Sequence, residues 1–290
     1  MTPLIRQGNT PFEVVTSRDN KWLKRFRAAL RGNALKEGDP VGVEGRKLVE
    51  EAFHSGREVE ALLASASAED DLQRILGAAS YRPRILRTSD KLFEGVAGTE
   101  TPQGVAALVK QPSWGFDDIL RGISARDGSF NAVAPLIVVL AGIQDPGNVG
   151  TIVRSAEAFG ATGVVTTRGT ADPWLPKALR ASAGSALRLP LLRGMSVPIL
   201  LAQLRVAQVM TLAATSRREP QDEKKHPDYL GRMAIFIGSE GAGLPAELER
   251  SADARVSIPI SAAVESLNAA IAASVLLYEV ARHRRARSQP

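Results

Sequence analysis

In the C-terminal half of the chain, short apolar runs of strand length alternate with segments whose apolar residues recur at helical spacing. Residues 135–141 form one such run, and Ile152, Ala156 and Phe159 share one helical face in the segment that follows. The same criteria predict strands at 209–212, 233–237 and 256–259 and a long apolar helix from 267 to 283. This alternation favours an α/β fold, and from the pattern alone the expected form is an unknotted doubly wound sheet.

The N-terminal half shows the same alternation on a smaller scale. Its predicted strands lie at 41–44, 59–65, 84–88 and 104–109, and its predicted helices lie at 46–54, 70–79 and 91–96. Ahead of these elements, Leu23, Phe26 and Leu30 recur at helical spacing, which predicts an amphipathic helix. This half of the chain is therefore expected to form a small α/β domain.

A stretch rich in proline, glycine, aspartate and asparagine separates the two periodic regions. A chain of 290 residues is long enough for two domains of ordinary size. We therefore expect a first, substrate-binding domain over 1–111, a linker over 112–134 and a second domain over 135–290.

Three segments that follow predicted strands, 145–150, 238–245 and 265–268, contain the residues best suited to a ligand site. Loops at the carboxyl ends of neighbouring strands converge on one crevice, which predicts a composite site. Gly147 and Gly150 would permit a tight turn there, and Arg154 on the following helix would aim its donors into the crevice. Each feature also has a simpler interpretation: a solvent-facing helix arginine for Arg154, a common glycine-rich turn for the second segment and a helix cap for Ser266.

The amino-acid sequences of these segments, and their order along the chain, resemble those of a known protein family. The segments 148–156 (NVGTIVRSA), 237–241 (IGSEG) and 258–268 (IPI followed by VESLN) resemble the three motifs of the SpoU, or TrmH-like, branch of the SPOUT RNA 2'-O-methyltransferases. The resemblance extends over residues 135–285, about half of the chain. In one departure, Ser261-Ala262-Ala263 stands where the family more usually has a glycine-containing turn, which bears on the fine shape of the pocket.

The resemblance implies S-adenosylmethionine as the cofactor, a SPOUT-type trefoil-knotted α/β domain and a homodimer whose two subunits complete the active site. The residues that match the cofactor pocket by position are Gly238, Ile258 and Leu267, with Ala213, Glu240 and Gly241 beside them. The residues that match positions for substrate positioning and catalysis are Asn148, Arg154, Ser266 and Asn268, with Glu157 as a supporting polar residue.

The implied chemistry depends mainly on positioning, because the methyl group of a sulfonium is already electrophilic. An arginine stays protonated in proteins, so we do not expect Arg154 to act as a base. We expect it to clamp the phosphate beside the target nucleotide and to stabilise negative charge on the ribose oxygen. Ser266 or Asn268 would orient the ribose hydroxyl.

The first domain and the charge distribution both point to RNA. In family members a domain at this position resembles ribosomal proteins that bind kinked RNA, and the segments 43–45 and 101–104 are similar to that domain. The chain carries a net charge of +6, and residues 18–36 contain seven basic residues and one acid. The candidates for RNA phosphates are Lys21, Lys24, Arg25, Arg27 and Arg31, with a solvated basic face as the alternative. A second basic cluster, 282–287, would lie near RNA or form a solvated chain end.

Composition argues against several other classes of protein. The chain has no cysteine and its three histidines lie far apart, so we expect neither disulfides nor a metal site. No apolar run approaches the length of a membrane span, and the N-terminus lacks the pattern of a secretory signal, so a cytoplasmic protein without a membrane partner is expected.

These features predict S-adenosylmethionine-dependent methylation of a ribose 2'-hydroxyl in structured RNA. Ribosomal RNA is the preferred substrate because of the extra N-terminal domain. The alternatives are a transfer RNA 2'-O-methyltransferase and a catalytically silent RNA-binding assembly factor, although intact Arg154, Ser266 and Asn268 argue against the latter. A nucleotide-binding oxidoreductase would need a glycine fingerprint that 145–148 does not provide. The target nucleotide, its base and a housekeeping or resistance role are left open.

Overall fold

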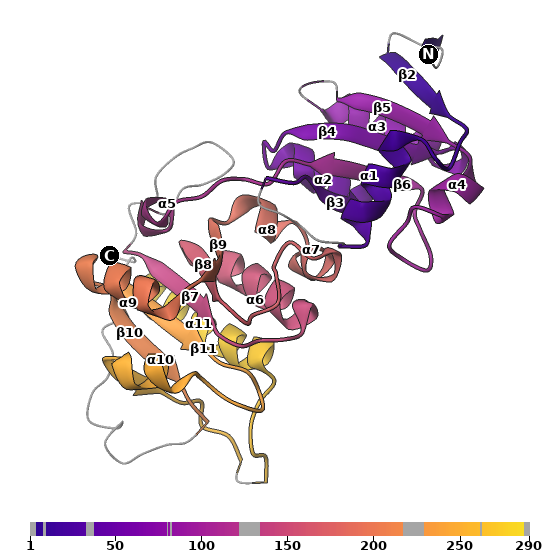
Figure 1. The fold of residues 1–290 in the computed structure, drawn as a ribbon. Helices are drawn as coiled ribbons and strands as arrows, with labels where there is room; N and C mark the ends of the chain where they lie inside the picture. The colour runs from indigo at the N-terminus through magenta and orange to yellow at the C-terminus, as the bar shows by residue number, and fades with distance from the viewer. Residues whose placement is uncertain are drawn as a thin grey trace. The chain divides into compact units, whose positions relative to one another are not determined.

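The computed structural model describes residues 4–7, 10–32, 38–79, 81, 83–121, 134–216, 229–261 and 263–286. The chain forms two compact units (Figure 1). The first consists of Met1–Ser113 with Trp174–Arg180, and the second of Trp114–Pro173 with Ala181–Pro290. Each unit has its own six-stranded sheet and its own hydrophobic core. Residues 122–133, which make up half of the predicted linker, lie outside the described part of the chain.

The sheet of the first unit has the strand order β1-β2-β5-β4-β6-β3. Strands β2, β5 and β4 run parallel, whereas β1 pairs antiparallel with β2, and β6 pairs antiparallel with β4 and β3. The strands span Leu4–Gln7, Thr10–Val15, Val41–Glu44, Val59–Ser65, Arg84–Thr88 and Val105–Val109, in the order β1 to β6. The four predicted strands are confirmed. The pattern misses β1 and β2, because Pro11 within β2 interrupts a strand signal.

The helices of this unit also follow the predicted pattern. Those before residue 114 are α1 (Lys21–Leu30), α2 (Arg46–His54), the 3₁₀ turn η1 (Ala66–Ala68), α3 (Glu69–Ala78) and α4 (Asp90–Glu94). Leu23, Phe26 and Leu30 on α1 are buried in the core, so the predicted amphipathic helix is confirmed. The side chain of Asn20 caps α1 by accepting a hydrogen bond from the Trp22 N–H at 2.8 Å.

The sheet of the second unit is entirely parallel, with the order β12-β10-β11-β7-β8-β9. Its strands are β7 (Leu136–Leu140), β8 (Gly163–Thr167), β9 (Leu191–Met195), β10 (Met210–Ala214), β11 (Met233–Ile237) and β12 (Ala254–Val256). The central strands β11 and β7 are buried along their whole length, as expected for a parallel sheet covered on both faces. The predicted α/β architecture is confirmed, while the trefoil knot stays a prediction.

The helices after residue 114 are α5 (Phe116–Arg121), α6 (Pro146–Ala158), α7 (Pro176–Ser182), α8 (Ser185–Arg188), α9 (Val197–Val206), α10 (Ala246–Ser251) and α11 (Ala269–Ala286). Helix α5 belongs to the core of the second unit, because Ile119 is fully buried and a Cβ atom at Gly163 would lie 2.6 Å from its side chain. A boundary at residue 135 would therefore cut into this core.

The first glycine-containing segment is a helix start and not a loop. The Asp145 side chain accepts a hydrogen bond from the Gly147 N–H at 3.0 Å, and Pro146 occupies the first helical position. Both are start signals for a helix, so α6 begins at Pro146 and includes Gly147 and Gly150. The expectation of a tight turn at these two glycines is wrong.

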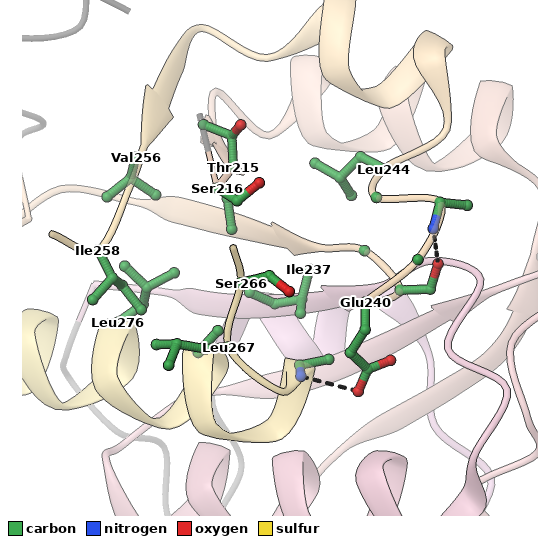
Figure 2. A pocket seen from close by; sticks show the side chains of 18 of the residues that line it. Thr215, Ser216, Ile237, Glu240, Leu244, Val256, Ile258, Ser266, Leu267 and Leu276 are labelled. Carbon is green, nitrogen blue, oxygen red and sulfur yellow. Dashed lines mark hydrogen bonds between the residues drawn. The ribbon is translucent and has the colours of Figure 1, made fainter. Parts of the chain in front are cut away.

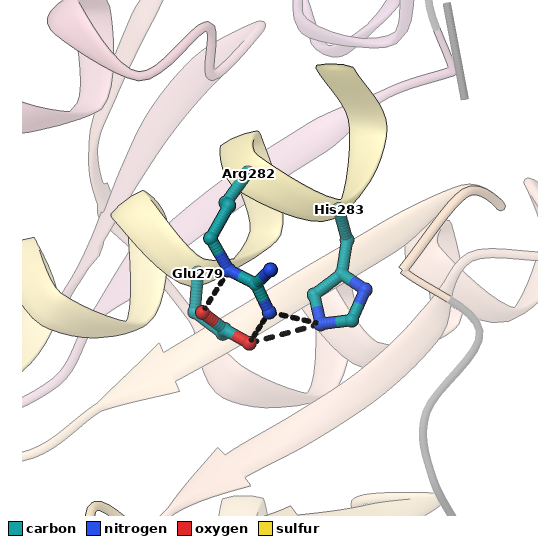
Figure 3. A network of polar contacts seen from close by, with 3 residues as sticks. All are labelled: Glu279, Arg282 and His283. Carbon is teal, nitrogen blue, oxygen red and sulfur yellow. Dashed lines mark hydrogen bonds and ion pairs between the residues drawn. The ribbon is translucent and has the colours of Figure 1, made fainter. Parts of the chain in front are cut away.

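The C-terminal end of α11 is held by contacts within the protein. Arg282 donates two hydrogen bonds to the Glu279 carboxylate, at 2.9 and 2.7 Å, and His283 Nε2 lies 2.9 Å from the same carboxylate (Figure 3). The hydrogen bonds from Arg282 lower the pKa of the Glu279 carboxyl to about 2. Arg284 donates to the carbonyl oxygens of Tyr229, Ala134, Pro135 and Gly231 at 2.9, 2.7, 3.3 and 2.9 Å. The second basic cluster is thus part of an ordered helix up to Ala286, and Arg287 lies outside the described residues.

No helix within the described residues is long and apolar enough to cross a membrane. Nor do the described parts of the chain contain a group of His, Asp or Glu side chains that could hold a metal ion. His226 lies outside the described ranges.

Candidate functional site

The three segments singled out in the sequence meet at the carboxylate of Glu240. Its Oε1 atom accepts hydrogen bonds from Asn148 Nδ2 at 2.8 Å, from Asn268 Nδ2 at 3.0 Å and from the Ala269 N–H at 3.1 Å. Asn268 Nδ2 also lies 3.2 Å from Asn148 Oδ1. We call Asn148, Glu240 and Asn268 the Glu240 network. Each residue comes from a different segment, so the predicted convergence is present in the structure.

Asn268 also begins helix α11. Its Oδ1 atom accepts hydrogen bonds from the N–H groups of Ala270 and Ile271, at 2.9 and 3.3 Å. It is therefore the N-cap of α11, and the interpretation of Ser266 as a simple helix cap is wrong. All the hydrogen-bonding capacity of the Asn268 side-chain nitrogen is used, because both of its N–H groups point to the Glu240 network.

Arg154 lies on α6, outside the Glu240 network. Its side chain is exposed, and it makes no hydrogen bond or ion pair with any residue that the structure describes. Three residues farther along, Glu157 pairs with Arg188 of α8 through two hydrogen bonds of 2.6 and 2.8 Å. Glu157 thus joins two helices, whereas the Arg154 guanidinium is free to take a ligand.

A cavity of about 380 Å³ opens beside the Glu240 network (Figure 2). Among its lining residues are six of the predicted site residues, Gly238, Glu240, Gly241, Ile258, Ser266 and Leu267. Ala213 is fully buried and does not line the cavity, although the next residue, Ala214, does. Three further polar residues of the lining were not predicted from the sequence, namely Thr215, Ser216 and Glu249. Thr215 and Ser216 follow directly on β10, and their place at a strand end is the signal that could have indicated them.

The cavity has the features that an adenosine-containing cofactor needs. Its volume lies within the usual range for small-molecule sites. Val256, Ile258, Ile260, Leu267 and Leu276 supply apolar surface for a ring system. Within the described chain, the main-chain groups of Ile258 and Leu267 have no hydrogen-bond partner, so they remain available to the polar edge of a base. The lining therefore fits S-adenosylmethionine.

Gly238 is required by the turn that follows it. Ser239 and Gly243 exchange main-chain hydrogen bonds of 3.1 and 3.0 Å, which folds the segment back on itself. A Cβ atom at position 238 would lie 2.3 Å from the main-chain carbon of Gly243. A side chain there would collide with the turn before it reached the cavity.

The five predicted RNA-binding cations lie on and just after α1 in the first unit, and their surroundings differ. Lys24 pairs with Asp19 at 3.3 Å, and Arg25 forms a double hydrogen bond with Glu60 at 2.5 and 2.7 Å. Arg27 and Arg31 both donate to the Gly95 carbonyl. Lys21 is exposed and has no partner among the described residues. Lys24 and Arg25 therefore have a carboxylate partner, whereas the other three cations have none among the described residues.

Known proteins resemble both units. Residues 135–278 match the SpoU rRNA Methylase family, and residues 43–114 match the family described as RNA 2'-O ribose methyltransferase substrate binding. The chain is 31% identical to the 23S rRNA (guanosine(2553)-2'-O)-methyltransferase RlmP of Bacillus subtilis, over 82% of this chain and 87% of that protein. It is 33% identical to an uncharacterized tRNA/rRNA methyltransferase of Synechocystis, over 95% of this chain and 96% of that protein.

Solved structures agree with these matches. The SpoU methyltransferase AviRb from Streptomyces viridochromogenes, in complex with AdoMet, superposes with a TM-score of 0.78 and 27% identity, over 92% of this chain and 98% of that chain. An AdoMet-bound rRNA methyltransferase from Sinorhizobium meliloti gives a TM-score of 0.76 and 29% identity, over 94% and 98% of the two chains. The chain therefore belongs to the SpoU family of S-adenosylmethionine-dependent RNA 2'-O-methyltransferases.

Proposed function

We propose that this protein methylates the 2'-hydroxyl of one nucleotide in ribosomal RNA, with S-adenosylmethionine held in the cavity beside the Glu240 network. The observation that carries the proposal is the convergence of Asn148, Glu240 and Asn268 at the rim of a cavity that fits the cofactor. The relatives named for ribosomal RNA support the choice of substrate.

The bound cofactor would supply an electrophilic methyl group, so the residues of the chain have to hold the ribose hydroxyl in line with it. Ser266 is the candidate for this task. It is exposed, lines the cavity and has no partner within the described residues. Asn268 is less suited, because its side chain is already committed to the cap of α11 and to the Glu240 network. Its role is to fix the main chain two residues after Ser266.

Arg154 would bind the RNA and not the cofactor. A guanidinium presents a planar fork that matches a phosphate, and it stays charged at neutral pH. Because Arg154 is exposed and unpaired, it can clamp the phosphate next to the target nucleotide and stabilise negative charge that develops on the ribose oxygen.

We also propose a homodimer formed through α11. Within helix α11, Leu276 and Val280 are buried in the unit itself and are not available to a partner. Ile271, Val275 and Tyr278 remain, with exposures of 55%, 41% and 54%. They lie along one face of the helix, and a second copy would cover them. A mass near 31 kDa from light scattering at micromolar concentration would contradict the dimer.

The proposed location of the protein is the cytoplasm, where its RNA substrate is found.

Mapping of ribose methylation in a deletion strain and its parent tests the function. We expect one site in ribosomal RNA to lose its methyl group and to regain it when the gene is restored. Loss of a methyl group from transfer RNA instead would support the alternative substrate. If every site stayed methylated, and the purified protein bound RNA without transferring a methyl group, the silent assembly factor would be the better description.

A further inference from the structure

We propose that Arg27 and Arg31 form a phosphate-binding clamp for the RNA substrate. We call these two side chains, with the Gly95 carbonyl between them, the Arg27–Arg31 clamp. The proposal rests on the proposed function, because it takes RNA as the ligand. It also extends RNA binding beyond the matched substrate-binding segment, which starts at residue 43, whereas α1 spans Lys21–Leu30.

The two guanidinium groups converge on one oxygen atom. Arg27 Nε donates to the Gly95 carbonyl at 3.1 Å, and Arg31 Nη2 donates to the same oxygen at 3.2 Å. Neither arginine has a carboxylate partner in the described part of the chain. Two like charges held so close repel each other, and an anion bound between them would offset this repulsion. Each group has five N–H donors, so most of them remain available to a phosphate.

Close main-chain packing fixes this arrangement. A Cβ atom at Gly98 would lie 2.2 Å from the Leu30 carbonyl, so the loop after α4 rests directly on the end of α1. The Gly98 N–H donates to Glu44 Oε2 at 2.8 Å, which anchors the same loop to β3. Gly42 of β3 is equally tight, because a Cβ atom there would lie 2.7 Å from the Leu30 nitrogen. The clamp is therefore largely pre-organised, which reduces the entropy cost of binding a phosphate.

Two other arginines near α1 serve as a contrast. Arg25 is held by Glu60 through hydrogen bonds of 2.5 and 2.7 Å, and Arg84 is held by Glu13 at 2.9 Å. Both stack on the Trp22 ring, with guanidinium carbons 4.8 and 5.0 Å from its centroid. A phosphate would have to compete with these carboxylates. All four arginines carry the same charge. Arg27 and Arg31 differ from Arg25 and Arg84 because no carboxylate is paired with them in the described part of the chain.

The test compares two double variants of the full-length protein with equal loss of charge, Arg27→Gln/Arg31→Gln and Arg25→Gln/Arg84→Gln. Binding to ribosomal RNA from the deletion strain is measured over a series of salt concentrations. We expect the clamp variant to bind more weakly and its salt slope to flatten by roughly 1.5 to 2 units, as for two lost phosphate contacts. The control should change by less than about half a unit. The circular dichroism spectrum and the thermal unfolding curve of both variants should match those of the wild-type protein, which verifies the folding of the first unit.

An unchanged slope in the clamp variant would overturn the proposal, and so would equal flattening in both variants, because net charge alone would then explain binding. If the double clamp variant does not fold, Arg31→Gln alone should flatten the slope by roughly one unit. Methylation of the same RNA by the wild-type protein is measured in parallel. Methylation with unchanged slopes would refute the clamp and leave the proposed function intact. Without methylation the proposed function fails, and the difference between the two slopes still decides for or against the clamp.

Discussion

The two ends of helix α11 are both polar, but the N-terminal end contributes to the candidate site and the C-terminal end is held by contacts within the protein. At its N-terminal end, Asn268 meets side chains from two distant segments, and Ser266 remains unpaired beside a cavity. At its C-terminal end, Glu279, Arg282 and His283 pair within one turn (Figure 3). Arg284 donates hydrogen bonds to four carbonyl groups there. The site thus differs from the scaffold in having unpaired polar groups next to a cavity, and not in the density of its charges.

Loss of Arg154 should have the largest effect on methyl transfer. In Arg154→Ala the cofactor should still bind, because the cavity is built from other residues. Single-turnover methylation at saturating RNA and cofactor should fall by about a hundredfold or more, the scale expected when a charge-stabilising donor is removed. Arg154→Lys should rescue poorly, since an ammonium lacks the planar fork.

Arg205→Ala is the matched control for Arg154→Ala. Arg205 is another exposed arginine on a helix of the second unit, α9, and its side chain has no partner in the described chain. Its loss should leave the single-turnover rate unchanged. A near wild-type rate in Arg154→Ala would remove this residue from the mechanism, and full rescue by lysine would show that charge alone is sufficient.

Glu240→Ala should have the next largest effect. It removes the acceptor of three hydrogen bonds and leaves the amides of Asn148, Asn268 and Ala269 without that partner. Hydrogen bonds to charged groups contribute about 1.5–3 kcal/mol, so the single-turnover rate should fall about tenfold or more as Ser266 loses its support. Glu247→Ala removes an exposed carboxylate of α10 and should have no effect. Equal rates in the two variants would show that the Glu240 network connects the three segments but does not support methyl transfer.

The sequence predicts much of this site because its signals are local. The strand ends, the glycine-rich turn and the motif residues are all visible in short segments, and Glu240 and Ser266 were found in this way. The sequence does not show which polar atoms are already used. The saturation of Asn268 and the helical start at Pro146 depend on partners or caps that only the fold brings together. Strands β8 and β9 and helix α9 were missed as well. Strand β8 is buried along its whole length and shows no alternation of apolar and polar residues, whereas β9 is only partly buried.

A pair of glycines tests whether the cavity depends on the turn after β11. In Gly238→Ala the new Cβ would collide with the main chain of Gly243, so the turn has to open. The affinity for S-adenosylmethionine should fall about tenfold, as for the loss of one or two main-chain contacts. Excess cofactor should recover most of the methyl transfer. In Gly241→Ala the Cβ has no neighbour within 4 Å, so calorimetry should give wild-type affinity. Similar affinities for both variants would contradict the role of the turn.

The smallest effect on methyl transfer is expected at the other end of α11, where two adjacent arginines differ in their partners. Arg284→Ala removes the donor for the carbonyl groups of Tyr229, Ala134, Pro135 and Gly231 and should lower the free energy of unfolding by about 2–3 kcal/mol. Arg285 is exposed, and Arg285→Ala should change stability very little. Denaturant unfolding followed by methylation assays on the folded enzymes separates the two effects. Both variants should methylate RNA at the wild-type rate, because neither arginine contributes to the cavity or to the Glu240 network. If Arg284→Ala instead remained fully stable but lost RNA affinity, the C-terminal end of α11 would be a binding surface, and the distinction between its two ends would fail.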